Sequence, residues 1–266
     1  MAQRRVLITG AGSGLGQAMA IRHARAGDQV ACVDRDAARA SATAASLPGT
    51  GHADFVADVG DDASMEALRD AVLARWGGVD VLYNNAGIAS GGCMAATTMD
   101  EWRRLLDINL LGVVRGCLAF LPGMLAQKGG HILNTASFAG LAGAPNMMTY
   151  GVSKAAVVAL SEQLRAELID EGVKVSVICP AFFQTNLLES WQGDPRMKKF
   201  GEKMMTHAVD TLDSVADAVF ASAQRGEFLI LPTRQEPMRW RLKRWLPGLY
   251  FRKLRAMAAG IRGKQA

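Results

Sequence analysis

Short apolar runs that alternate with helical patterns are the feature that most limits what this 266-residue chain can fold into. Most of the runs are continuously apolar rather than alternating, as expected for parallel strands that are buried on both faces. Because each return to a parallel strand needs a right-handed crossover, the pattern predicts an α/β fold with a doubly wound, parallel, seven-stranded sheet. The expected strands are Arg5–Thr9, Gln29–Val33, Asp54–Ala57, Val79–Tyr83, His131–Thr135, Lys174–Cys179 and Phe228–Leu231.

The composition is that of a soluble globular protein, since 50% of the residues are hydrophobic and 21% are charged. It excludes intrinsic disorder, collagen and coiled coil. The chain shows no internal repeat and no linker, so we expect a single domain over residues 1–236. Residues 182–212 interrupt the alternation before the last helix, and residues 237–266 form a basic amphipathic extension beyond it.

The C-terminal extension, residues 237–266, carries nine Lys and Arg residues and no Asp or Glu. The rest of the chain holds 21 basic and 25 acidic residues, so nucleic acid is not an expected partner. Basic residues beside Trp240, Trp245 and Tyr250 are typical of a helix in peripheral contact with an anionic membrane. The alternative is that these aromatic side chains pack on the domain or on a second subunit, and the sequence leaves both interpretations open.

We expect neither a membrane-spanning segment nor a signal peptide. The longest uncharged run, Ile132–Ser153, contains several polar residues and Pro145, whereas a spanning helix needs about 20 predominantly apolar residues. The apolar run after Arg4 and Arg5 is only Val6–Ile8. The four cysteines form no CxxC pair, which favours free thiols in a reducing compartment. These observations predict a cytoplasmic protein, with membrane association through the extension left open.

A glycine-rich turn, Thr9–Gly16, follows the first expected strand. Gly10 allows a sharp turn, Gly14 lets the backbone approach a diphosphate, and Gly16 allows the next helix to pack closely on the strand. The N–H groups at the start of that helix, around Ser13 and Leu15, then face the phosphates. The position of this turn predicts a dinucleotide site.

Asp34 ends the second strand, 18 residues after Gly16, near the offset at which an acidic residue binds the adenosine ribose. A carboxylate there accepts hydrogen bonds from the ribose hydroxyls and repels a 2′-phosphate, so NAD is favoured over NADP. Arg35 keeps NADP open, because an adjacent guanidinium can reach a 2′-phosphate. The plainer explanation of Asp34 is an N-cap for the helix expected over residues 37–47.

With this turn, several motifs resemble the short-chain dehydrogenase/reductase family over about residues 4–235. Asp58-Val59 is similar to the family's adenine-contacting pair, and Asn84-Asn85-Ala86-Gly87 to its NNAG motif. The family usually has Gly where this chain has Ala181, so we expect a local difference there. The resemblance implies a Rossmann-fold short-chain dehydrogenase domain over residues 1–236. It implies cofactor contacts from Gly10, Ser13, Gly14, Leu15, Gly16, Asp34, Arg35, Asp58, Val59, Asn85, Ala86, Gly87, Tyr150, Lys154, Pro180 and Thr185.

Asn109, Ser137, Tyr150 and Lys154 resemble the family's catalytic tetrad. Tyr150 and Lys154 are four residues apart and therefore share one helix face. A free tyrosine, with a pKa of about 10, is a poor base near neutrality, and a nearby ammonium is expected to lower that pKa. The resemblance implies that Tyr150 transfers the proton and that Lys154 binds the nicotinamide ribose. It also implies that Ser137 donates a hydrogen bond to the substrate oxygen and that Asn109 holds a water of a proton relay. Taken singly, each is an ordinary packing, turn or surface residue.

We therefore predict an NAD(P)-dependent oxidoreductase that transfers hydride between nicotinamide and a hydrophobic secondary alcohol or ketone. In the family, the segment matching 182–212 is a lid over the substrate, and its Met and aromatic residues favour an apolar ligand or, alternatively, a local core. The other hypothesis is a catalytically silent dinucleotide-binding scaffold docked to a membrane through the extension. The prediction includes a homodimer or homotetramer and no metal, because the four His residues lack ligand spacing.

Overall fold

The computed structural model describes residues 3–263, and seven strands form one parallel sheet in the order β3-β2-β1-β4-β6-β7-β9. The strands are β1 (Arg5–Thr9), β2 (Gln29–Asp34), β3 (Ala53–Val56), β4 (Val81–Asn84), β6 (Gly130–Thr135), β7 (Val173–Ile178) and β9 (Leu229–Ile230). Every expected strand is present with each end within two residues. The predicted doubly wound parallel sheet is therefore confirmed.

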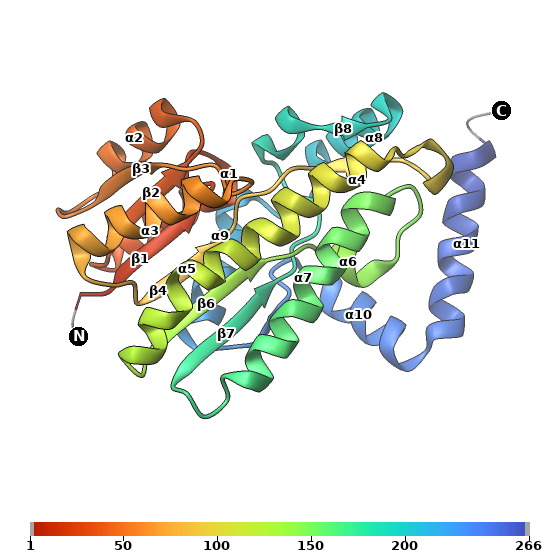
Figure 1. Cartoon of the computed structure of the whole chain (residues 1–266). Helices are drawn as coiled ribbons and strands as arrows, with labels where there is room; N and C mark the ends of the chain where they lie inside the picture. Colours follow the sequence, from red (N-terminus) through yellow and green to blue (C-terminus); the bar gives the residue numbers. More distant parts are fainter. Residues whose placement is uncertain (1–2, 264–266) are drawn as a thin grey trace.

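Helices cover both faces of the sheet (Figure 1). One face is covered by α3 (Asp62–Trp76), α5 (Gly112–Ala126) and α7 (Met148–Glu167), and the other by α1 (Gly14–Arg25), α2 (Ala37–Ser46) and α9 (Leu212–Gln224). Within β1, Leu7 packs into the first of these layers, whereas Val6 and Ile8 pack into the second. This two-sided burial explains why the strands are apolar at successive positions.

The helix expected after Trp102 consists of three parts. These are α4 (Met99–Leu106), η2 (Asp107–Leu111), which is a π-helical turn, and α5. In the described part of the chain, this run, Met99–Ala126, is long and apolar enough to cross a membrane by length and composition. It instead packs on the sheet through residues such as Val113, Cys117 and Phe120, as a core helix does.

The lid segment, residues 182–212, contains η3 (Asn186–Ser190), β8 (Gln192–Gly193) and α8 (Pro195–Thr206). β8 pairs with β5 (Ser90–Gly91) in a separate two-stranded sheet. Gly91 is needed there, because a Cβ at that position would lie 2.7 Å from the Trp191 ring. The lid is therefore fixed to the body of the domain beside the residues that follow β4. Two further short helices, η1 (Met94–Ala96) and α6 (Phe138–Ala142), complete this end of the domain.

The extension forms α10 (Glu236–Trp245) and α11 (Pro247–Gly263), which lie at the end of the molecule farthest from α2 and α3 (Figure 1). Trp240 packs against the core and Tyr250 is buried, as the packing interpretation expects. Trp245 and Phe251 are 77% and 53% exposed, so they do not follow that interpretation. Residues 264–266, which include Lys264 of the predicted basic extension, lie outside the described residues.

Candidate active site

A cleft of about 470 Å³ lies where the strand order reverses, at the carboxyl ends of β1 and β4. This is the position at which doubly wound sheets bind their ligands. Of the predicted site residues, Gly10, Ser13, Gly14, Leu15, Asp34, Arg35, Asp58, Val59, Asn85, Ala86, Gly87, Ser137, Tyr150, Lys154, Pro180 and Thr185 line it. Gly16 and Asn109 do not, and each lies just behind the cleft wall.

The glycine-rich turn is shaped by steric requirements. Gly10 and Gly14 have φ values of +67° and +54°, which an L-residue rarely adopts. Gly16 lies against the turn itself, because a Cβ there would be 2.2 Å from the Gly10 carbonyl oxygen. Gly16 therefore has the helix-packing role expected of it and makes room for the phosphate-binding turn without facing the cleft.

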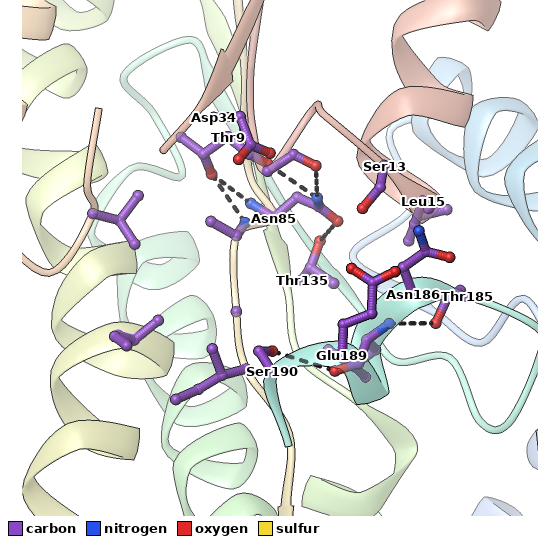
Figure 2. A pocket seen from close by; sticks show the side chains of 18 of the residues that line it. Thr9, Ser13, Leu15, Asp34, Asn85, Thr135, Thr185, Asn186, Glu189 and Ser190 are labelled. Atoms are coloured by element: carbon purple, nitrogen blue, oxygen red, sulfur yellow. Dashed lines mark hydrogen bonds between the residues drawn. The ribbon is translucent and has the colours of Figure 1, made fainter. Parts of the chain in front are cut away.

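A hydrogen-bonded set of polar side chains holds the floor of the cleft (Figure 2). Thr9 Oγ1 accepts hydrogen bonds from the backbone N–H groups of Asn85, at 2.9 Å, and Ala86, at 3.1 Å. Asn85 Nδ2 donates to the Thr9 carbonyl oxygen at 3.0 Å, and Thr135 Oγ1 donates to Asn85 Oδ1 at 3.3 Å. These contacts connect β1, β4 and β6, so the NNAG motif fixes the cleft floor.

The Asp34 carboxylate is oriented by the backbone around it. Its Oδ2 accepts from the Gly12 N–H at 2.9 Å and its Oδ1 from the Asp36 N–H at 3.1 Å. The plainer explanation was that Asp34 is the N-cap of α2. That position is instead held by Asp36, whose side chain accepts from the Arg39 N–H. Asp34 thus lies beside the turn and lines the cleft, and its contact with an adenosine ribose stays a prediction.

Tyr150 and Lys154 are both buried on α7, and burial controls their protonation. The Lys154 ammonium donates to the Thr135 carbonyl oxygen at 2.8 Å and lies 5.9 Å from the centre of the Tyr150 ring. Burial lowers the pKa of Lys154 to about 8. Burial also raises the pKa of Tyr150, and the nearby Ser137 side chain offsets this only partly. The pKa of Tyr150 is therefore raised overall and not lowered as expected, because desolvation of the phenolate is the larger effect.

Ser137 lies between β6 and α6 and serves as the N-cap of α6. Its Oγ accepts from the Ala139 N–H at 3.2 Å and donates to the Pro180 carbonyl oxygen at 3.3 Å. The expected difference at Ala181 involves no left-handed backbone, because in the described chain only Lys128 and Asn146 have a positive φ among the non-glycine residues. An alanine is therefore accommodated where the family usually has glycine.

Asn109 is fully buried in η2, behind the cleft wall. Its side chain accepts from the Ile88 N–H at 2.9 Å and donates to the Ile88 carbonyl oxygen at 3.0 Å and to Ser153 Oγ at 3.2 Å. A Cβ on Gly87 would meet both Asn109 Oδ1, at 3.1 Å, and Lys154 Nζ, at 3.3 Å. Asn109 thus supports the segment after β4 and lies on the same side of Gly87 as the Lys154 ammonium.

The sequence analysis missed a contact between the lid and α2 across the cleft. Arg39 Nη2 donates to Glu189 Oε2 at 3.0 Å, and both residues line the cleft. Figure 2 shows Glu189, Asn186 and Thr185 on the wall opposite Asp34 and Asn85. Arg39 is three positions after Asp36, within one helix turn, but nothing in the sequence pairs Arg39 with a residue 150 positions away.

The residues of this cleft fit a nicotinamide dinucleotide. Ser13, the N-cap of α1, makes no side-chain hydrogen bond to the helix. The first backbone N–H groups of α1 are therefore available to a diphosphate. The space in front of Gly14 is open, since the only neighbour of a Cβ there is Thr185, at 3.6 Å. Asp34 would hold the adenosine ribose and Lys154 the nicotinamide ribose.

Comparison with known proteins identifies the family. A model of the short chain dehydrogenase family matches residues 4–196. This chain belongs to the short-chain dehydrogenase family. The family's pattern accounts for the cleft, the glycine-rich turn and the Tyr150/Lys154 pair. The extension and most of α8 lie beyond the matched residues.

Two curated relatives in the short-chain dehydrogenase family illustrate the range of similarity. The meso-2,3-butanediol dehydrogenase of Serratia marcescens is 34% identical over 226 residues, which cover 84% of this chain and 89% of the relative. The probable oxidoreductase EphD of Mycobacterium tuberculosis is 35% identical over 232 residues and 83% of this chain. The match covers only 39% of EphD, so this chain corresponds to less than half of that protein.

Solved short-chain dehydrogenases have the same fold and contain nicotinamide cofactors. A member from Burkholderia phymatum, in complex with NAD, has a TM-score of 0.87 and 31% identity, covering 93% of this chain and 95% of that one. A member from Sphingobium yanoikuyae, in complex with NADPH, has a TM-score of 0.77 and 31% identity, covering 92% and 94%. The family thus uses nicotinamide cofactors, and similarity alone does not choose between NAD and NADP.

Proposed function

We propose that this protein is a cytoplasmic, NAD-dependent oxidoreductase that interconverts a hydrophobic secondary alcohol and its ketone. The observation that carries the proposal is that Ser137, Tyr150 and Lys154 share one cleft with the phosphate-binding turn and Asp34. Bound nicotinamide would supply or accept the hydride, and the chain's own residues orient the substrate and move the proton. Turnover of apolar alcohols and ketones with NAD(H) and NADP(H) tests this assignment.

Tyr150 exchanges the proton with the substrate oxygen, and Ser137 donates a hydrogen bond that orients that oxygen. Because burial raises the pKa of Tyr150, the neutral phenol predominates and is ready to protonate a ketone. In the opposite direction, the Lys154 ammonium stabilises the phenolate that accepts the alcohol proton. Asn109 lies behind Gly87 and would hold a water that exchanges protons with Lys154.

The substrate class is supported by apolar residues that line the cleft. Phe183, Leu187 and Met205 of the lid line it together with Ala181. Other apolar lid residues form the local core that was the alternative interpretation, since Leu188 packs on Gly201 and Trp191 on Gly91. The cleft-lining residues favour a substrate with apolar groups on both sides of its carbinol carbon. The butanediol dehydrogenase relative is likewise named for a secondary alcohol.

Replacing Asp34 tests the cofactor preference. We expect Asp34→Ala to weaken NADH binding by about 10- to 100-fold, the effect of losing hydrogen bonds to a charged group. NADPH binding should weaken less or improve, because the repulsion of a 2′-phosphate is removed. Calorimetric titration of both cofactors into both proteins measures these changes.

The control for that variant is Asp34→Asn, which keeps an acceptor for the Gly12 N–H, removes the charge and gives up the hydrogen bond from the Asp36 N–H. It should retain most of the NADH affinity and lose much of the discrimination against NADPH. A wild-type protein that binds NADPH more tightly than NADH contradicts the assignment and gives the dominant role to Arg35.

We also propose that the extension contacts an anionic membrane, because one face of α10 exposes apolar side chains beside a cation. Met238 and Trp245 are seven residues apart, hence on one helix face, and are 70% and 77% exposed. Arg241 is exposed between them, while Trp240 and Lys243 face the domain on the other side. With no acidic residue in 237–266, the chemistry that complements this face is an anionic lipid surface.

The vesicle test replaces two exposed aromatic residues of the extension, Trp245 of α10 and Phe251 of α11, in the double variant Trp245→Ser with Phe251→Ser. Wild-type protein should bind phosphatidylserine-containing vesicles at low salt and be released at high salt, since each cation contributes about 1 kcal/mol and is screened by salt. The double variant should bind at least about tenfold more weakly, whereas Ile169→Ser, which alters an equally exposed residue after α7, should not change binding. Equal binding by wild type and double variant, or a change of oligomeric state in the variant, excludes membrane docking by this face.

A further inference from the structure

The short helix α6 connects the catalytic serine to the C-terminal extension. Ser137 caps its first turn, and the helix ends at Gly143, whose φ of +65° gives the left-handed terminus. At its middle, α6 lies directly on the backbone of α7. A Cβ on Gly140 would be 2.6 Å from both the Lys154 carbonyl carbon and the Ala155 nitrogen. A shift of α6 therefore changes the position of Ser137 relative to the Tyr150–Lys154 face of α7.

Two side chains of the extension hold the other end of α6. Lys243 Nζ donates to the Leu141 carbonyl oxygen, and the Tyr250 hydroxyl donates to the Ala142 carbonyl oxygen at 3.0 Å. The last carbonyls of a helix lack intrahelical partners, so these donors satisfy groups that otherwise need water. The Lys243 ammonium is also favourable at a helix C-terminus because of the helix dipole. Tyr250 is 7% exposed, so its hydrogen bond is shielded from solvent.

We propose that Lys243 and Tyr250 are positioning residues that hold α6, and through it the Ser137 hydroxyl, in register with Tyr150. Both lie beyond residues 4–196, the part that matches the family model. The proposal rests on the function proposed above for Ser137. It gives the packed face of the extension a role in the reaction, separate from the exposed face that carries Trp245.

The test combines Tyr250→Phe with Lys243→Met, which removes both donors and keeps the ring and the aliphatic chain. With the best substrate of the wild-type protein, we expect kcat to fall by about tenfold or more, because small displacements of a positioned group are costly. The Kd for NADH should stay within about twofold. Lys243→Arg, which can still donate to Leu141, should retain the wild-type kcat. Lys253→Met, which removes an exposed cation of α11, is the matched control.

Amide hydrogen exchange gives a readout that does not depend on turnover. The Ala139 amide, which donates to Ser137 Oγ, should exchange faster in the double variant, while amides in the middle of α7 stay protected. Unchanged exchange at Ala139 overturns the proposal whatever the activity. An unchanged kcat in the double variant also overturns it. So does a double variant that loses kcat, NADH affinity and thermal stability together, if Lys243→Arg shows the same losses. If no substrate is turned over by the wild type, the proposed function fails, and the exchange experiment still decides whether the extension holds α6.

Discussion

Tyr150→Phe is expected to lower kcat by about 10²- to 10⁴-fold, the usual contribution of a general acid–base group. The substitution removes the hydroxyl that is proposed to transfer the proton and keeps the ring, which is buried on α7. The fold and the NADH affinity should therefore stay close to those of the wild type. Steady-state rates, far-ultraviolet circular dichroism and NADH titration measure the three quantities on one preparation.

Tyr83→Phe is the control for this experiment, because it removes the same atom from another buried tyrosine. The Tyr83 hydroxyl lies 3.0 Å from His23 Nε2, away from the residues that line the cleft. It should reduce stability and leave kcat nearly unchanged. A Tyr150→Phe protein that keeps more than about a tenth of wild-type kcat is incompatible with an acid–base role for Tyr150.

Lys154→Ala should reduce both turnover and cofactor affinity. The ammonium is proposed to hold the nicotinamide ribose and to stabilise the phenolate of Tyr150, so its removal affects two steps. We expect kcat to fall by about 10²-fold or more and the Kd for NADH to rise by about tenfold or more. Rapid-mixing kinetics and fluorescence titration with NADH separate the two effects.

Two further variants interpret that result. Lys154→Met retains most of the buried aliphatic volume, so an equal loss in this variant assigns the effect to the charge rather than to a cavity. Lys174→Ala removes an exposed lysine at the amino end of β7 and should change neither quantity. If Lys154→Ala binds NADH as tightly as the wild type, Lys154 does not contact the nicotinamide ribose.

The sheet and the phosphate-binding turn were predictable because their signals are local. A strand buried on both faces must be apolar at consecutive positions, as Val6, Leu7 and Ile8 are. The turn needs glycine at positions with positive φ or with no room for a Cβ, as at Gly10 and Gly16. Such requirements leave a pattern in the sequence whatever the rest of the chain does.

Features that depend on distant contacts were not predictable. The π-helical turn that places Asn109 has no local marker, and the Arg39–Glu189 pair joins residues 150 positions apart. The sign of the Tyr150 pKa shift depends on burial, which a spacing of four residues does not reveal. In the extension, the composition is compatible both with membrane contact and with packing of the aromatic side chains on the domain. The fold buries Tyr250 and exposes Trp245, which only the three-dimensional structure shows.

Formation of NADH by the wild-type protein from NAD and a panel of apolar secondary alcohols tests the central claim most directly. The matching ketones with NADH and NADPH give the reverse direction. The proposed function predicts NADH formation with at least one alcohol, in equal amount to the ketone produced, and its loss in Tyr150→Phe. Tight dinucleotide binding without hydride transfer in either direction, with every substrate and both cofactors, would contradict it and identify a dinucleotide-binding scaffold.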